Sequence, residues 1–449
     1  MSSSKTLDEP LTYSTGDIIH EDDPYACALS SDVLSAVCSY CISRGTSHSC
    51  EKCKRLHYCS KRCKSKDRVF HRLECQVLRA LGPEDDVLDE ETRMVIRTLD
   101  RFIRERQSHS ISEASFFSCT RTIYDLLSHI EDLSPSEFEQ AKERAETILS
   151  IVSPFVFTQL EEVMDILQRC RINCHSIVDH NDFHFFSRGR AVYLAASKTN
   201  HSCVTSNEYV QIFNGRKILL RAIQDFRIDD PLQMTIHYMP PTLPYESRLR
   251  RCLNNYYFIC SCRKCVWQAR NPEPDQAAGE TVAEIEQAFE EYHSSDEWYE
   301  IGTKLLEKVK NLPEKNFYVY WLLIQMQPTC FELGKYKESI EYGIRATNGA
   351  ESILSLEPLF HYLCQAMVKL GWNKSSNPNH GRFAETYKLT KTLYSITHGS
   401  NHKIVQGLRK MRGTWWAKGS DKLYSFFRKQ DPVDSQRVDD VRDGAIEVQ

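Results

Sequence analysis

The sequence predicts an α+β protein in which a strand-rich core is interrupted by a zinc-binding segment and a helical insert. An all-helical carboxyl-terminal domain is expected to follow. Three observations predict this fold class. Two groups of cysteines have metal-ligand spacing, β-branched and aromatic runs fill residues 183–240, and apolar positions recur at helical spacing on both sides of that region. The chain has 449 residues, which is too long for one compact core, so we expect several domains.

The first cysteine group spans residues 38–75 and follows the spacing C-x2-C-x8-C-x2-C-x5-C-x3-C-x7-H-x3-C. Eight ligands suit two tetrahedral zinc sites, and in so short a segment the metal supplies folding energy that a small core cannot. Buried free thiols are the alternative, but this spacing is highly specific for metal. The expected ligands are Cys38, Cys41, Cys50, Cys53, Cys59, Cys63, His71 and Cys75.

The second group, Cys260, Cys262 and Cys265, has the spacing C-x-C-x2-C and leaves one zinc coordination position open. Cys203 is the natural fourth donor, because it ends the polar motif Asn-His-Ser-Cys at residues 200–203. Cys203 is then a metal ligand and not a nucleophile. The sequence therefore predicts three zinc ions.

Helical periodicity marks two regions. ETRMVIRTLDRFIRERQ and SEFEQAKERAETILSIV predict helices before residue 180, the second with a cap at Ser134-Pro135-Ser136. Asn214-Gly215 predicts a hairpin with a type I′ turn. After residue 280 the pattern is helical, and Leu333-Gly334 and Leu370-Gly371 close two apolar stretches, which indicates TPR-like hairpins.

Charge and hydropathy exclude several classes of function. A net charge of -4 argues against a general nucleic-acid-binding surface, although the basic finger segment alone would permit a DNA-binding regulator. The longest apolar run, residues 318–324, is too short to span a bilayer, so we expect no membrane contact. The amino terminus lacks the pattern of a secretory signal, and an intracellular protein is expected.

The Asn-His-Ser-Cys motif, the C-x-C-x2-C group and the preceding finger together resemble the SET- and MYND-domain (SMYD) family of protein lysine methyltransferases. The resemblance extends over nearly the whole chain. It implies that Cys38, Cys41, Cys59 and Cys63 share one zinc, and that Cys50, Cys53, His71 and Cys75 share another. It divides the chain into residues 1–37 (first part of the SET domain), 38–75 (MYND finger), 76–182 (helical insert), 183–250 (SET core), 251–270 (post-SET zinc segment), 271–428 (TPR-like domain) and 429–449 (disordered tail).

The resemblance implies transfer of a methyl group from S-adenosyl-L-methionine to a lysine of a histone or another protein or peptide. Tyr238 would orient the amine and the methyl group, and Tyr256 and Phe258 would form walls of the lysine and cofactor pocket. Ser197, Asn200 and His201 would contact the cofactor, with His201 a positioning residue and not a general base. The alternative for a tyrosine that ends a strand is a place in the core. Tyr238 would also contact the cofactor.

The resemblance further implies a monomer of the nucleus and cytoplasm, with protein partners bound through the finger and the carboxyl-terminal helices. Some positions depart from the family. Residues 4–15 contain no glycine where relatives have G-x-G, the segment after Cys203 lacks a proline, and His175 stands where relatives have asparagine. These departures favour a second hypothesis, a catalytically inactive SET/MYND adaptor that binds other proteins.

Overall fold

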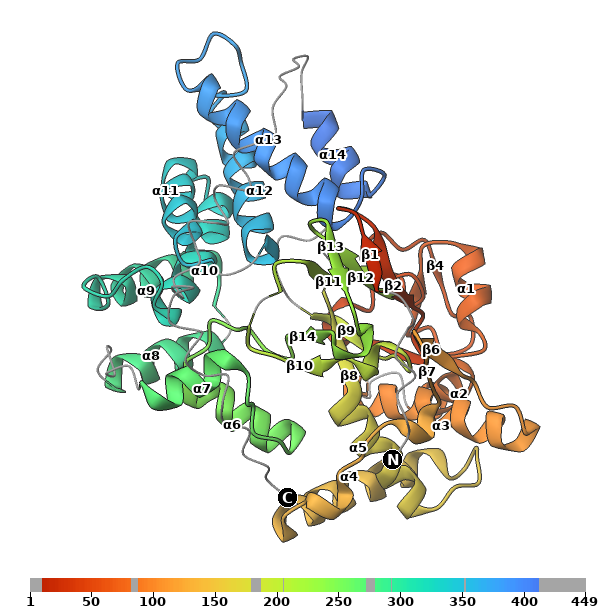
Figure 1. Cartoon of the computed structure of the whole chain (residues 1–449). Helices are drawn as coiled ribbons and strands as arrows, with labels where there is room; N and C mark the ends of the chain where they lie inside the picture. Colours follow the sequence, from red (N-terminus) through yellow and green to blue (C-terminus); the bar gives the residue numbers. More distant parts are fainter. Residues whose placement is uncertain are drawn as a thin grey trace.

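The computed structural model describes residues 10–81, 88–178, 187–204, 206–271, 279–291, 293–350 and 353–411 (Figure 1). The expected tail at 429–449, the first nine residues and most of the linker after Asn271 lie outside these ranges. Within them, every helix is too short or too polar to cross a lipid bilayer.

Small sheets build the core. One three-stranded sheet has the order β11-β12-β2, and another has the order β3-β9-β8. Two further pairs flank them: β1 runs antiparallel to β13, and β10 runs parallel to β14. The bounds are β1 Leu11–Tyr13, β2 Ile18–Asp22, β3 Ala26–Leu29, β8 Cys174–Val178, β9 Ser187–Val192, β10 Asn200–His201, β11 Tyr209–Asn214, β12 Lys217–Ala222, β13 Phe226–Ile228 and β14 Thr235–Ile236.

The hairpin β11–β12 forms where the sequence predicts it, but its turn differs. Asn214 pairs with Lys217, so Gly215 and Arg216 are the two central residues. Gly215 has a φ of 61°, and Arg216 has no positive φ, whereas a type I′ turn requires positive φ at both central positions. The prediction of a type I′ turn is therefore wrong. A Cβ on Gly215 would also lie 2.6 Å from the Cys41 carbonyl oxygen, because the hairpin tip packs on the finger.

The finger and the insert follow β3. The finger contains one short hairpin and two helices, and α3 and α4 coincide with the two predicted helical windows. Ser134 caps α4 and shares a reciprocal capping box with Glu137. The insert range also holds the hairpin β6–β7 and strand β8, so it is not helical throughout. The bounds are β4 His48–Ser49, β5 His57–Tyr58, α1 Lys61–Asp67, α2 Arg72–Ala80, α3 Glu90–Ser108, β6 Ala114–Phe116, β7 Cys119–Arg121, α4 Pro135–Val152 and α5 Leu160–Asn173.

Helices make up the rest of the described chain. Helix α10 ends just before Leu333-Gly334 and α12 just before Leu370-Gly371, and both glycines have positive φ, as expected at a helix carboxyl terminus. Successive helices from α9 to α13 pack on one another. The bounds are α6 Tyr245–Tyr256, α7 Arg263–Arg270, α8 Gly279–Glu290, α9 Ser295–Lys308, α10 Phe317–Glu332, α11 Tyr336–Thr347, α12 Ile353–Lys369, α13 His380–Thr397 and α14 Lys403–Met411.

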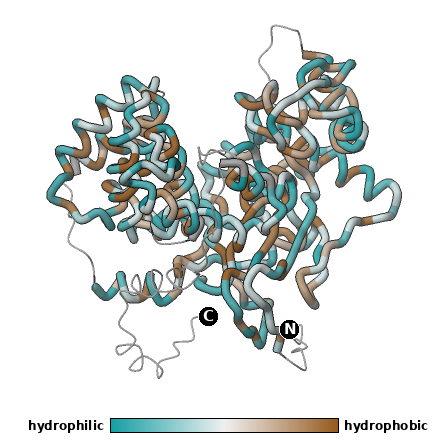
Figure 2. Tube along the Cα trace, turned by 90° about the horizontal axis from the view of Figure 1, so that it is seen from above, coloured by the Kyte–Doolittle hydropathy of each residue, from teal (hydrophilic) through white to brown (hydrophobic). Residues whose placement is uncertain are grey.

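Two large apolar clusters stabilise the two halves of the molecule. One joins α3, α4 and α5 to β3 and β9, and the other joins α9, α10 and α12 to β11 and β12. Figure 2 shows two lobes, and apolar segments occur in both of them. The second cluster matters for the site, because it fixes α10 against the strand core.

Candidate functional site

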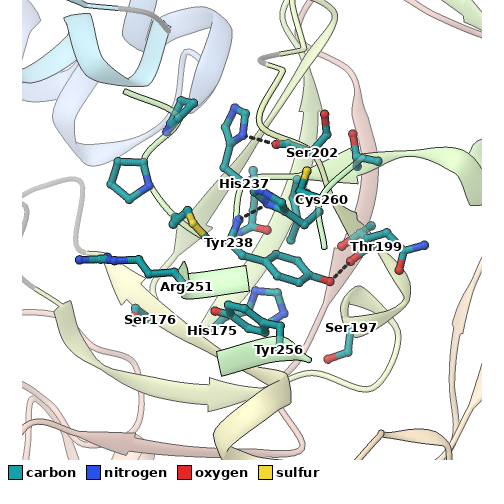
Figure 3. A pocket seen from close by; sticks show the side chains of 18 of the residues that line it. His175, Ser176, Ser197, Thr199, Ser202, His237, Tyr238, Arg251, Tyr256 and Cys260 are labelled. Atoms are coloured by element: carbon teal, nitrogen blue, oxygen red, sulfur yellow. Dashed lines mark hydrogen bonds between the residues drawn. The ribbon is translucent and has the colours of Figure 1, made fainter. Parts of the chain in front are cut away.

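A cleft of about 1490 Å³ lies between the strand core, the insert, the segment around α6 and α7, and helix α10. Its lining includes all six residues that the sequence analysis assigned to cofactor or substrate: Ser197, Asn200, His201, Tyr238, Tyr256 and Phe258. These residues come from segments up to 61 positions apart, and the fold brings them to one place. Figure 3 shows Tyr238 and Tyr256 side by side in this cleft, with Ser197 and Thr199 nearby.

Tyr238 follows β14 and its ring extends across the cleft. Its hydroxyl donates a hydrogen bond to the Thr199 carbonyl oxygen over 2.8 Å (Figure 3). Burial, reinforced by the neighbouring Tyr256, raises the pKa of Tyr238 to about 12. The phenol therefore keeps its proton at neutral pH. Its oxygen retains lone pairs that can accept a hydrogen bond from a bound group.

Two more aromatic rings surround Tyr238. The ring centroids of Tyr238 and Tyr256 lie 4.8 Å apart, and Phe258 lies 6.5 Å from Tyr238 and 6.4 Å from Tyr256. Tyr256 is the last residue of α6, and Phe258 follows the left-handed residue Tyr257 that ends the helix. The three rings form an apolar, π-rich wall. Burial against this wall disfavours the protonated form of an amine, because the charge loses its hydration and has no counter-ion. A cation that lies directly over a ring face is nevertheless attracted by that ring.

His201 has both ring nitrogens engaged within the protein. Nδ1 accepts a hydrogen bond from the Tyr238 backbone N–H at 3.1 Å, so the neutral ring carries its proton on Nε2. Nε2 lies 3.1 Å from the Cys203 sulfur. Any contact of His201 with a cofactor would therefore use its backbone. The imidazole connects a cysteine ligand to the backbone of Tyr238.

Ser197 and Asn200 both line the cleft. The Ser197 hydroxyl donates to the Tyr193 carbonyl oxygen and lies 3.4 Å from the Asn173 carbonyl oxygen. Asn200 is exposed on the short strand β10, which pairs with β14. Asn200 is thus accessible from the cleft, and the hydroxyl of Ser197 is already satisfied.

The structure assembles three groups of metal-ligand side chains, and their membership matches the sequence analysis. In each group the donor atoms lie within 4.8 Å of one another. Four ligands around one zinc ion should be about 3.8 Å apart, given metal–sulfur bonds of about 2.3 Å. The groups are Cys38, Cys41, Cys59 and Cys63; Cys50, Cys53, His71 and Cys75; and Cys203, Cys260, Cys262 and Cys265.

Measured separations agree with that geometry. The Cys41–Cys59 sulfurs lie 3.6 Å apart, the Cys50–Cys75 sulfurs 3.7 Å, and the Cys203–Cys260 sulfurs 3.9 Å. All-thiolate and thiolate–imidazole sets are the usual structural zinc ligands. The three groups therefore fit three zinc ions.

Sequence reasoning missed several residues of the cleft. Arg121, from the insert strand β7, lines it, and burial lowers the pKa of its guanidinium. Thr199 contributes only a backbone carbonyl oxygen, which no sequence pattern can reveal. His175 on β8 also lines the cleft, and burial lowers its pKa to about 4, so it is neutral at pH 7. His175 is the exception among these residues, because the sequence analysis identifies it as a departure from the family pattern.

Comparison with known proteins finds relatives that match most of the chain. No protein-family model matches it. Histone-lysine N-methyltransferase SMYD3 of Mus musculus is 24% identical over 406 residues, covering 88% of this chain and 91% of the relative. Histone-lysine N-methyltransferase SMYD1 of Homo sapiens is 24% identical, with 88% and 84% covered. N-lysine methyltransferase SMYD2-A of Danio rerio is 22% identical, with 89% and 93% covered.

Proposed function

The chain belongs to the SET- and MYND-domain (SMYD) family, and from this we propose that it is an S-adenosylmethionine-dependent protein lysine N-methyltransferase. The observation that carries the proposal is the aromatic wall of Tyr238, Tyr256 and Phe258 beside the Asn200–Cys203 loop. A cleft lined with aromatic rings suits the transfer of a methyl group from a sulfonium to an amine.

S-adenosylmethionine, when bound, supplies a methyl group on a sulfonium that is open to in-line attack. The residues of the chain supply the surroundings. Tyr238, Tyr256 and Phe258 desolvate the substrate amine, which favours its neutral and nucleophilic form. Because the Tyr238 hydroxyl donates to Thr199, its oxygen is free to accept an N–H from that amine and so orient the nitrogen lone pair.

His201 and Ser197 support this arrangement in our proposal. His201 holds the Tyr238 backbone through Nδ1 and therefore positions the tyrosine without removing a proton. Ser197 fixes the loop through its bonds to backbone carbonyl oxygens, and Asn200 is left to contact polar parts of the cofactor. The assignment of these residues to the cofactor comes from the family motif.

Finer points belong to the same proposal. The substrate would be a lysine of a histone or of another protein, entering between the strand core and α10. The finger and the carboxyl-terminal helices would bind protein partners. We also propose a monomer that works in nucleus and cytoplasm, with the domain limits given above.

The test is a binding and transfer experiment with the full-length chain. Calorimetry with S-adenosylmethionine is followed by incubation with methyl-labelled cofactor and lysine-rich histone and non-histone peptides. We expect saturable cofactor binding and label on lysine. No binding at millimolar cofactor would overturn the proposal.

The adaptor hypothesis is favoured by one specific observation: His175 lines the cleft, at a position where the family resemblance implies asparagine. A neutral imidazole offers one donor and one acceptor in a bulkier shape than an amide. The adaptor hypothesis would be supported if the chain binds the cofactor but transfers no methyl group to any peptide. It would also be supported if the chain shows neither cofactor binding nor methyl transfer. Restored transfer in His175→Asn would place the loss at this residue.

A further inference from the structure

Among the residues that the structure describes, Arg248 is a buried cation without a carboxylate partner. It lies on α6, is 1% exposed, and no Asp or Glu of the described chain is within ion-pair distance of it. Its terminal nitrogens donate to the Leu243 carbonyl oxygen and to the Gln268 side chain, and Nε has no hydrogen-bond partner in the described part of the chain. A buried charge is costly unless an opposite charge balances it. Arg248 therefore needs an anion nearby.

Arg93 and Arg97, two buried arginines of α3, provide a comparison with Arg248. Arg93 and Arg97 are 1% and 4% exposed, and each has at least one carboxylate partner. Arg97 contacts Asp67 and Glu74, and Arg93 lies 3.6 Å from Glu74. Arg248 differs from both, because the neighbour that it faces is a cysteine: Nη2 lies 3.9 Å from the Cys265 sulfur.

With zinc bound, the third cysteine group would carry negative charge beside Arg248. One zinc ion with four thiolates carries a net charge of about -2. Cys203, Cys260 and Cys265 are buried, so water screens this charge poorly. The other four-cysteine group is different, since three of its four cysteines are half-buried and closer to solvent. The third site therefore has the greater need of a protein counter-charge.

We infer that Arg248 is the counter-ion of the third zinc site, and that its guanidinium helps to retain the zinc held by Cys203, Cys260, Cys262 and Cys265. Arg248 and Tyr256 occupy the same helix, α6. Loss of the metal would leave the charge of Arg248 without an opposite charge. Arg248 would then be an unpaired buried cation on the same helix that carries Tyr256 of the cleft wall. The inference concerns metal retention and does not depend on methyl transfer.

The test measures zinc release from the full-length protein to a chromophoric chelator. In Arg248→Met, which removes the charge and keeps an apolar side chain of similar length, one of three zinc ions should leave about 10-fold faster or more. The other two should leave at the wild-type rate. Arg250→Met is the matched control, because Arg250 is exposed on the same helix, and its release should equal wild type. Unchanged release of all three ions from Arg248→Met would overturn the inference.

Two further variants separate charge from packing. Arg248→Lys keeps the charge and should retain the third zinc, and it decides the question if Arg248→Met does not fold. Rapid zinc loss from Arg248→Lys would show that packing of the guanidinium matters and would overturn the inference. In a Cys203→Ser background, where the third ion is already lost, Arg248→Met should cause no further zinc loss; loss of a second ion would also overturn it.

Discussion

At the scale of single residues, the hydroxyl of Tyr238 is the group whose removal tests the proposed chemistry most directly. It donates to Thr199 and, with a pKa raised to about 12 by burial and by Tyr256, stays protonated. Tyr238→Phe keeps the ring but cannot accept from the amine. We expect kcat to fall by about 100-fold or more while cofactor affinity changes by less than about 3-fold.

Single-turnover rates and calorimetry measure both quantities for Tyr238→Phe. Tyr245→Phe is the control, because Tyr245 lies on α6 outside the cleft, and it should behave as wild type. A Tyr238→Phe enzyme with an unchanged rate would remove Tyr238 from the role proposed for it.

The same scale shows what the sequence could reveal of the site. The structure brings the expected side chains of all three metal-ligand groups together, and thiolates at fixed short spacing have few other uses. Arg121, Thr199 and Arg248 could not be predicted. Their importance comes from burial, from a backbone carbonyl oxygen or from a neighbour distant in sequence, and none of these leaves a local pattern.

At the scale of elements, the contact between β3 and β9 depends on one glycine. Gly189 has a φ of 157°, and a Cβ there would lie 2.2 Å from the Ala28 carbonyl oxygen. Because backbone cannot give way as a side chain can, Gly189→Ala should lower the free energy of unfolding by about 3 kcal/mol or more. Urea denaturation measures the loss.

Gly16→Ala is the matched comparison for that strand contact. Gly16 also has positive φ, at 92°, but nothing lies within 4 Å of a Cβ added there. Only backbone strain is introduced, and a loss of about 1 kcal/mol is expected. Equal losses from the two variants would contradict the close approach of β3 and β9.

Local sequence predicted elements well where a local interaction fixes them. Helix α4 begins where Ser134 and Glu137 form a capping box, and these two residues lie only three positions apart in the sequence. The hairpin turn was predicted in place but with the wrong type. Its geometry is set by pairing of Asn214 with Lys217 and by the packing of Gly215 on Cys41, a residue of the distant finger.

Helix α12 carries a buried histidine that gives the protein a pH dependence. Burial lowers the pKa of His361 to about 3. Below pH 6.5 the unfolded chain binds a proton there that the folded chain does not, so stability falls as pH falls from 6.5 towards 3. In that window, each unit by which the pH falls lowers the free energy of unfolding by up to about 1.4 kcal/mol.

Between pH 6.5 and pH 5 this single group should remove about 2 kcal/mol of unfolding free energy. His361→Phe places a non-titrating aromatic ring beside Tyr394 and should flatten the pH dependence by that amount. Urea unfolding of both proteins at pH 7 and pH 5 measures the difference. Parallel pH profiles for wild type and variant would show that His361 is not the group responsible.

At the scale of the whole molecule, a buried set of charges joins the finger, the core and the insert. Arg97, on α3 of the insert, is 4% exposed and donates to Asp67 and Glu74 of the finger and to the Cys27 carbonyl oxygen of β3. Glu74 in turn lies 2.7 Å from Nδ1 of His71, a ligand of the second metal group. One guanidinium thus connects three segments, an arrangement that no single segment's sequence predicts.

Removing that guanidinium should cost far more than removing a surface cation. Arg97→Met leaves Asp67 and Glu74 buried with less positive charge, and we expect about 3 to 5 kcal/mol of unfolding free energy to be lost. Since Glu74 orients His71, zinc release from the second site should also accelerate. Lys64→Met, which breaks a finger ion pair with the largely exposed Glu51, should change stability little. If Arg97→Met and Lys64→Met unfold at the same urea concentration and release zinc alike, the finger is held to the core by apolar packing alone, and the charged network has no structural role.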